Sequence, residues 1–184
     1  MRDSSGEKTE YRRTIAGVSW PTATRPGWII VLGESRFPNF SIVGSPHTYH
    51  ELTSCSNASI DYLCRQAGKM LIERPEIEFF GDTTTPMSAV WISLGAPTLY
   101  KAQFCDNPED LHFYGHLIRK LLSAPKTLFF APESGIDGKL LVGMRQEDIS
   151  SGRAAEHPLL AAIGHAAIEL ELYRPVVSKA PRLF

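Results

Sequence analysis

Runs of apolar residues between short polar or proline-rich turns divide this chain into alternating strands and helices. The strongest strand signal is the apolar run WIIVL, which predicts a strand over 28–33. Loose alternation predicts a strand before it at 11–18, and the apolar segment 40–44 predicts one after it. Because short connections join the three segments, we expect an antiparallel meander.

The pattern then changes to a helical period. Ser59 can cap a helix over 60–73, whose apolar residues recur along one face. The strand predicted at 77–81 follows directly, and a helical crossover of this kind makes it parallel to a meander strand. The remaining signals predict helices at 87–94, from 108 to 122 and from 157 onward, and short strands at 99–104, 127–130 and 140–144.

The chain has 184 residues, which is enough for one domain with a substantial core. We expect a disordered tail at 1–10, a single α/β domain over 11–174 and an extended tail at 175–184. The residues predicted to form the core are Leu63, Phe79, Phe80, Leu117, Leu121 and Ile163.

Composition narrows the class of protein. The 43% hydrophobic and 21% charged residues are typical of a soluble globular chain, and a net charge of −1 gives no overall attraction to nucleic acid or membrane. Cys55, Cys64 and Cys105 form no CxxC pair, which indicates reduced structural thiols. We see neither a signal peptide nor a membrane span, so we expect no membrane partner and a cytoplasmic protein.

The segment IEFFGDTTTP brings a carboxylate to the end of a buried strand. Phe79 and Phe80 are consecutive, so both faces of the strand are covered. Asp82 follows at the carboxyl end, the edge where open α/β sheets place their chemistry. An isolated Asp at such a place commonly caps the next turn or helix instead. Both interpretations remain open.

Two histidine pairs are weaker candidates for a metal site. His112 and His116 have the i, i+4 spacing that can hold a divalent metal, but they lie off the apolar stripe and are better explained as a solvated face. His47 and His50 lie just after a predicted strand and lack a third ligand. No nucleophile elbow and no phosphate-binding glycine loop is present in the sequence.

Three carboxylates stand at the ends of predicted elements: Glu34, Asp82 and Glu156. Metal-dependent phosphodiester cleavage needs several carboxylates that converge on paired magnesium ions. If these three converge, they form a magnesium or manganese site, but their spacing alone does not decide this.

The order of the predicted elements resembles the ribonuclease H-like fold. The segments AGVS at 16–19 and GWIIV at 27–31 are similar to that fold's opening strand, which carries a metal-binding Asp, and to its second strand. FFGD at 79–82 matches the strand that delivers the second carboxylate, and EHPLLAA at 156–162 resembles the acidic start of the last helix. The resemblance covers 11–173 and is nearest to the nuclease domain of phage large terminases and to RuvC-type resolvases.

This resemblance implies an α/β domain with a ribonuclease H-like mixed sheet, an antiparallel meander plus parallel strands, flanked by helices. It further implies a viral nucleic-acid-processing or DNA-binding protein in the host cytoplasm. Cleavage would depend on Mg or Mn held by Asp82 and Glu156.

The chain departs from the family at its carboxylates. Ser19 stands where the first-strand Asp is expected, and His157 and Leu160 fall where the last helix offers Asp. A Ser brings no charge and cannot replace a bridging carboxylate. Either Glu34 substitutes for the lost ligand in an active nuclease, or the domain is catalytically inactive and serves as a structural or protein-interaction module.

Overall fold

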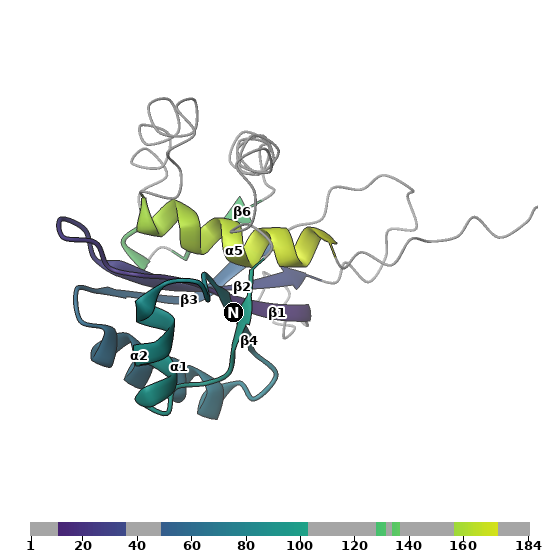
Figure 1. The fold of residues 1–184 in the computed structure, drawn as a ribbon. Helices are drawn as coiled ribbons and strands as arrows, with labels where there is room; N and C mark the ends of the chain where they lie inside the picture. Colours follow the sequence, from purple (N-terminus) through teal and green to yellow (C-terminus); the bar gives the residue numbers. More distant parts are fainter. Residues whose placement is uncertain (1–10, 36–48, 103–127, 132–133, 137–156, 173–184) are drawn as a thin grey trace, which may run out of the picture.

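The computed structural model describes residues 11–35, 49–102, 128–131, 134–136 and 157–172. A mixed sheet lies between helix α5 on one face and helices α1 and α2 on the other (Figure 1). The sheet has six strands in the order β5-β4-β1-β2-β3-β6. The strands are β1 Tyr11–Ser19, β2 Gly27–Ser35, β3 Tyr49–Asn57, β4 Glu78–Gly81, β5 Leu99–Lys101 and β6 Leu128–Phe129.

The sheet combines the two pairings that the sequence predicts. Strands β1, β2 and β3 form an antiparallel meander, and β4 pairs with β1 in parallel. Strands β5 and β6 extend the two edges, each parallel to its neighbour. The mixed ribonuclease H-like sheet flanked by helices is therefore confirmed.

The third strand of the meander was missed. The strand predicted at 40–44 lies outside the described residues, and the segment that pairs with β2 is β3, with the sequence YHELTSCSN. Its apolar positions are few. Even a buried position on the α5 face is polar: it is occupied by Glu51, which pairs with Leu32 of β2. The strand consequently carries little hydrophobic alternation for a pattern to detect.

The helices form where the sequence predicts them. Helix α1 covers Ile60–Glu73, and its N-cap Ser59 accepts a hydrogen bond from the backbone N–H of Tyr62 at 3.4 Å. Helix α2 covers Pro86–Ser93 and α5 covers Pro158–Leu172, each with a proline at its first position. The helix predicted over 108–122 and the strand predicted over 140–144 lie outside the described residues.

The core has one layer on each face of the sheet. Ile15, Ile30 and Leu32 pack against α5, whereas Ala16, Val18 and Ile29 pack against α1 and α2. The alternation along β1 and β2 thus separates the two layers. Of the predicted core residues, those described are all buried, namely Leu63, Phe79, Phe80 and Ile163. Leu117 and Leu121 lie outside the described residues.

Helix α5 packs unusually close to β1. A Cβ atom added to Gly17 would lie 1.8 Å from the carbonyl oxygen of Ala162 and 2.8 Å from the backbone nitrogen of Ala166. The alanines of α5 and the glycine of β1 therefore let two backbones meet directly. This contact fixes the position of α5 relative to the carboxyl end of β1.

None of the helices in the described segments has the length and apolar character needed to cross a membrane.

Candidate functional site

The carboxyl ends of β1 and β4 lie side by side because the two strands are parallel neighbours. Val18 pairs with Gly81 near the end of both strands, and Asp82 is the next residue after β4. Ile15, Gly17 and Ser19 alternate onto the α5 face of β1, and Phe80, which pairs with Gly17, lies on the same face of β4. The ends of these two strands form the carboxyl-terminal edge of the sheet, which we call the Asp82 edge. It carries Ser19 at the end of β1 and Asp82 directly after β4.

Asp82 is half-buried and held in one conformation. Its Oδ1 atom accepts hydrogen bonds from the backbone N–H and the hydroxyl of Thr84, at 2.8 and 2.6 Å. Its backbone carbonyl accepts a hydrogen bond from the indole Nε1 of Trp20 at 2.9 Å. Asp82 therefore does cap the turn before α2, but only through Oδ1. Its Oδ2 makes no hydrogen bond with the described residues, so a carboxylate oxygen remains available for a ligand.

His165 of α5 reaches the same edge. Its Nδ1 donates a hydrogen bond to the carbonyl oxygen of Val18 at 2.8 Å. That oxygen is next to β4, because a Cβ atom on Gly81 would lie 2.9 Å from it. Burial lowers the pKa of His165 from 6.5 to about 4, against opposing effects of the Val18 bond and the charge of Asp82. The ring is therefore neutral at pH 7, with its proton on Nδ1 and its lone pair on Nε2.

Little in the sequence points to His165. It is the one polar side chain in the stretch PLLAAIGHAAI, which otherwise reads as a buried apolar face. A buried histidine in such a stretch needs a hydrogen-bond partner inside the protein, and this need is the feature of the sequence that marks His165 as a residue of interest.

Ser19 has a structural task at this edge. It is buried, and its hydroxyl accepts a hydrogen bond from the backbone N–H of Trp28 at 3.2 Å. This bond closes the connection between β1 and β2. The residue at the position of the expected first-strand Asp is thus neutral and committed to the hairpin.

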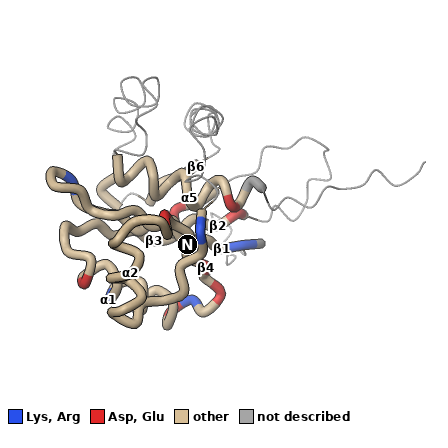
Figure 2. Tube along the Cα trace, in the orientation of Figure 1, with Lys and Arg blue, Asp and Glu red and all other residues tan. Residues whose placement is uncertain are grey.

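The connection between β1 and β2 also brings a positive charge to the edge. Arg25 is exposed, and its Nη1 donates a hydrogen bond to Nε2 of the buried His157, just before α5, at 2.7 Å. In Figure 2 the connection between β1 and β2 carries the blue colour of Lys and Arg. Arg25 is the sole Lys or Arg in the sequence of this connection, residues 20–26.

Glu34 lies at the other end of the sheet. Strand β2 runs antiparallel to β1, so Ile29 pairs with Val18 whereas Glu34 pairs with Arg13. Five residues of strand separate the two levels, about 17 Å. The expectation that Glu34 converges with Asp82 is wrong. Glu156 lies outside the described residues, and within the described segments no three His, Cys, Asp or Glu residues form a metal-binding group.

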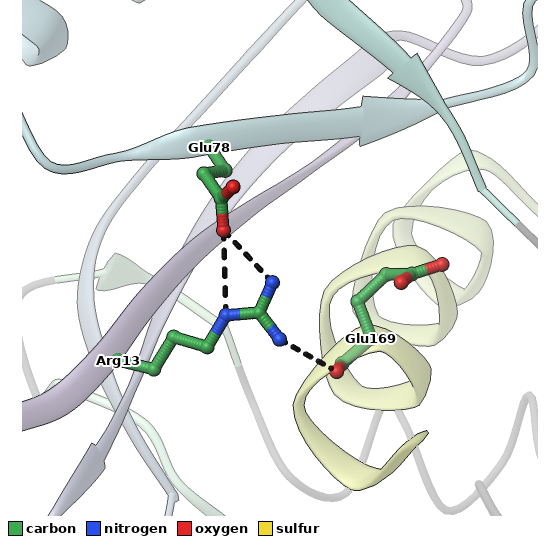
Figure 3. A network of polar contacts seen from close by, with 3 residues as sticks. All are labelled: Arg13, Glu78 and Glu169. Carbon is green, nitrogen blue, oxygen red and sulfur yellow. Dashed lines mark hydrogen bonds and ion pairs between the residues drawn. The ribbon is translucent and has the colours of Figure 1, made fainter. Parts of the chain in front are cut away.

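Near the end of the sheet where Glu34 lies, Arg13 connects three elements through an ion pair and a hydrogen bond. Arg13 of β1 binds Oε2 of Glu78 through Nε and Nη2, at 3.3 and 2.8 Å (Figure 3). Its Nη1 donates to the backbone carbonyl of Glu169 in α5 at 3.2 Å. The guanidinium therefore connects β1, β4 and the second half of α5. This arrangement stabilises the fold and is separate from the edge with Asp82.

The histidine pairs and the cysteines form no further site within the described segments. His50 lies within β3 and not after a strand, is half-buried, and has a pKa lowered by burial. His47, His112 and His116 lie outside the described residues. Burial raises the pKa of the Cys64 thiol and raises that of Cys55 to about 11, so both are protonated and unreactive at pH 7.

Comparison with known proteins agrees with this architecture. No protein-family model matches the chain, and no curated protein matches it. Among solved structures, the chain is similar to the crystal structure of the nuclease domain of the g2p large terminase from bacteriophage SPP1, with bound Mn. The TM-score is 0.58 at 10% identity, over 87% of this chain and 88% of that chain. The chain therefore has the ribonuclease H-like fold that its order of elements predicts.

Proposed function

We propose that this chain is a nucleic-acid-processing or nucleic-acid-binding domain that works at the edge formed by β1 and β4. The proposal rests on the position of Asp82, directly after β4 and beside the end of β1, in a fold shared with a phage terminase nuclease domain. A viral origin and the host cytoplasm as its location are part of this proposal.

The finer proposal is divalent-metal-dependent phosphodiester cleavage. Asp82 offers Oδ2, an oxygen ligand of the kind that Mg and Mn prefer. The resemblance adds Glu156, the residue before His157 in the sequence. Asp82 and Glu156 would hold the ion, and a bound divalent ion would stabilise charge on the phosphate and lower the pKa of a bound water.

The described residues fit one ion better than a pair. Two ions need bridging carboxylates, but Ser19 is neutral and Glu34 lies at the far end of β2. The edge supplies instead a neutral imidazole, His165, whose orientation is fixed by Val18.

A second function is favoured by two of these observations, the neutral Ser19 and the remote Glu34. A domain that has lost its first carboxylate and has no substitute from β2 is suited to a structural or protein-interaction role. In that alternative the turn-capping contact of Asp82 with Thr84 is the whole task of this side chain.

Cleavage assays distinguish the two functions. The protein is incubated with plasmid, single-stranded and branched DNA in the presence of manganese or magnesium. The active function predicts cleavage that Asp82→Asn abolishes and Glu34→Gln leaves unchanged, because Glu34 is remote from this edge. Intact DNA in every reaction of the folded wild-type protein supports the inactive alternative.

A further inference from the structure

We propose that Arg25 binds a backbone phosphate of the nucleic acid held at the Asp82 edge. This inference rests on the proposed function and adds a specific contact to it. Four observations carry it: the hydrogen bonds that hold the β1–β2 connection, the anchoring of the guanidinium, the lack of a carboxylate partner among the described residues, and the location at the end of the sheet where Asp82 lies.

The β1–β2 connection holds the backbone of Arg25 in place. The backbone N–H of Thr22 donates to the carbonyl of Arg25 at 2.9 Å, and the N–H of Arg25 donates to the hydroxyl of Thr22 at 3.1 Å. Pro21 and Pro26 restrict the connection further, and a Cβ atom on Gly27 would lie 2.7 Å from the nitrogen of Pro21. The turn therefore presents its side chain from a fixed position.

The guanidinium is anchored by a neutral partner, His157. Its bond to His157 uses one of five N–H donors, and the acceptor is an uncharged imidazole nitrogen, because an Arg can only donate. The residue as a whole is exposed. A guanidinium held at one corner with its other donors accessible loses little freedom when it binds a phosphate.

Arg25 differs in this respect from Arg13, Arg65 and Arg74, whose side chains are also described. Arg13 pairs with Glu78, and the two on the α1 side pair with carboxylates close in sequence: Arg65 with Asp61, and Arg74 with Glu76. Within the described segments, no carboxylate pairs with Arg25. An arginine whose charge no described carboxylate balances is suited to an anionic ligand.

Arg25 also lies on the correct edge of the sheet. The β1–β2 connection leaves β1 just beyond Ser19, at the end of the sheet where Asp82 follows β4. Trp20, in the same connection, binds the carbonyl of Asp82 directly. A nucleic-acid strand with one phosphodiester at Asp82 would bring further phosphates toward this connection, where the guanidinium can bind one in a bidentate way.

Equilibrium binding tests the inference. Fluorescence anisotropy of a labelled DNA duplex and a labelled single strand is measured in EDTA, so that neither is cut, across a series of salt concentrations. Arg25→Gln should weaken binding about tenfold and reduce the slope of log K against log salt by about 0.9 for the duplex, the value for one lost phosphate contact. Arg25→Lys should retain the salt slope and lose part of the affinity, because it keeps the charge but not the fork.

Arg65→Gln is the matched control, since it removes an exposed arginine from α1 on the other face of the sheet. It should bind like the wild type. If the wild type binds DNA and Arg25→Gln binds equally well with the same salt slope, Arg25 is not a phosphate ligand and the proposed function stands. If the folded wild type neither binds nor cuts any of the DNAs, the proposed function fails and this contact fails with it.

Discussion

The indole nitrogen of Trp20 donates a hydrogen bond to the backbone carbonyl of Asp82 at 2.9 Å, across 62 residues of sequence. The same indole packs edge-on against Trp91 of α2, with ring centroids 5.8 Å apart. Asp82 is thus held from the β1 side through its backbone and from its own turn through Thr84. The carboxylate has a defined position before any ligand binds.

Trp20→Phe tests this relationship. Phenylalanine keeps most of the packing against Trp91 but removes the N–H donor, which leaves the carbonyl of Asp82 without that bond. We expect the free energy of unfolding in urea to fall by about 1–3 kcal/mol. Trp28→Phe is the control, because the Trp28 indole makes no hydrogen bond with the described residues. An equal loss in the two variants would show that ring packing, and not the bond to Asp82, accounts for the effect.

His165 predicts a pH dependence of stability. Its pKa is lowered from 6.5 to about 4 in the folded protein, chiefly by burial, so between these values the unfolded chain binds more protons than the folded one. Stability should therefore fall as the pH decreases from about 6.5 to about 4 and should lose about 3 kcal/mol from this residue. Urea denaturation at a series of pH values measures this loss.

His165→Asn isolates that contribution. The amide nitrogen of Asn can take the place of Nδ1 as donor to the carbonyl of Val18, but Asn does not titrate. The variant should show a shallower loss of stability over the same pH range. Identical pH profiles for the wild type and the variant would mean that other groups cause the acid sensitivity.

Replacement of glycine by alanine should have opposite effects on stability at Gly17, which contacts α5, and at Gly68, which has open space around it. Gly17→Ala places a methyl group 1.8 Å from the carbonyl oxygen of Ala162, so α5 must move, at a cost we expect to exceed about 3 kcal/mol. Gly68→Ala, within α1, meets nothing within 4 Å and should stabilise the protein by about 0.5–1 kcal/mol. Thermal melting of the two variants checks both signs. A Gly17→Ala protein that melts like the wild type would rule out this close approach of α5.

The hydrophobic pattern predicted most of the described fold because the buried elements are strongly apolar. The run WIIVL and the Phe79–Phe80 pair are covered on both faces, and α1 has a clear apolar stripe with a Ser cap. Strand β3 escaped detection because it places Glu51 where a pattern would need an apolar residue. Its backbone pairing with β2, not its side chains, makes it a strand.

The candidate site was harder to predict, for two separate reasons. The convergence of Glu34 with Asp82 conflicts with the predicted antiparallel meander, because the carboxyl ends of antiparallel strands lie at opposite ends of the sheet. His165 could not be assigned to this edge because its position there depends on a hydrogen bond to a carbonyl in β1, 147 residues away. Position along the chain shows which residues end a strand, but not which helical side chain reaches that edge.

Manganese-dependent melting tests most directly whether Asp82 belongs to a working site. If Asp82 binds the ion, manganese at about a hundredfold its dissociation constant adds about 2.7 kcal/mol of stability, which corresponds to a rise in Tm of about 5–10 °C. Asp82→Asn retains Oδ1 as acceptor for Thr84 and should fold normally, but it should show no rise. A wild-type Tm that does not change with millimolar manganese, or an equal rise in wild type and Asp82→Asn, would contradict the assignment of Asp82 as the centre of this site.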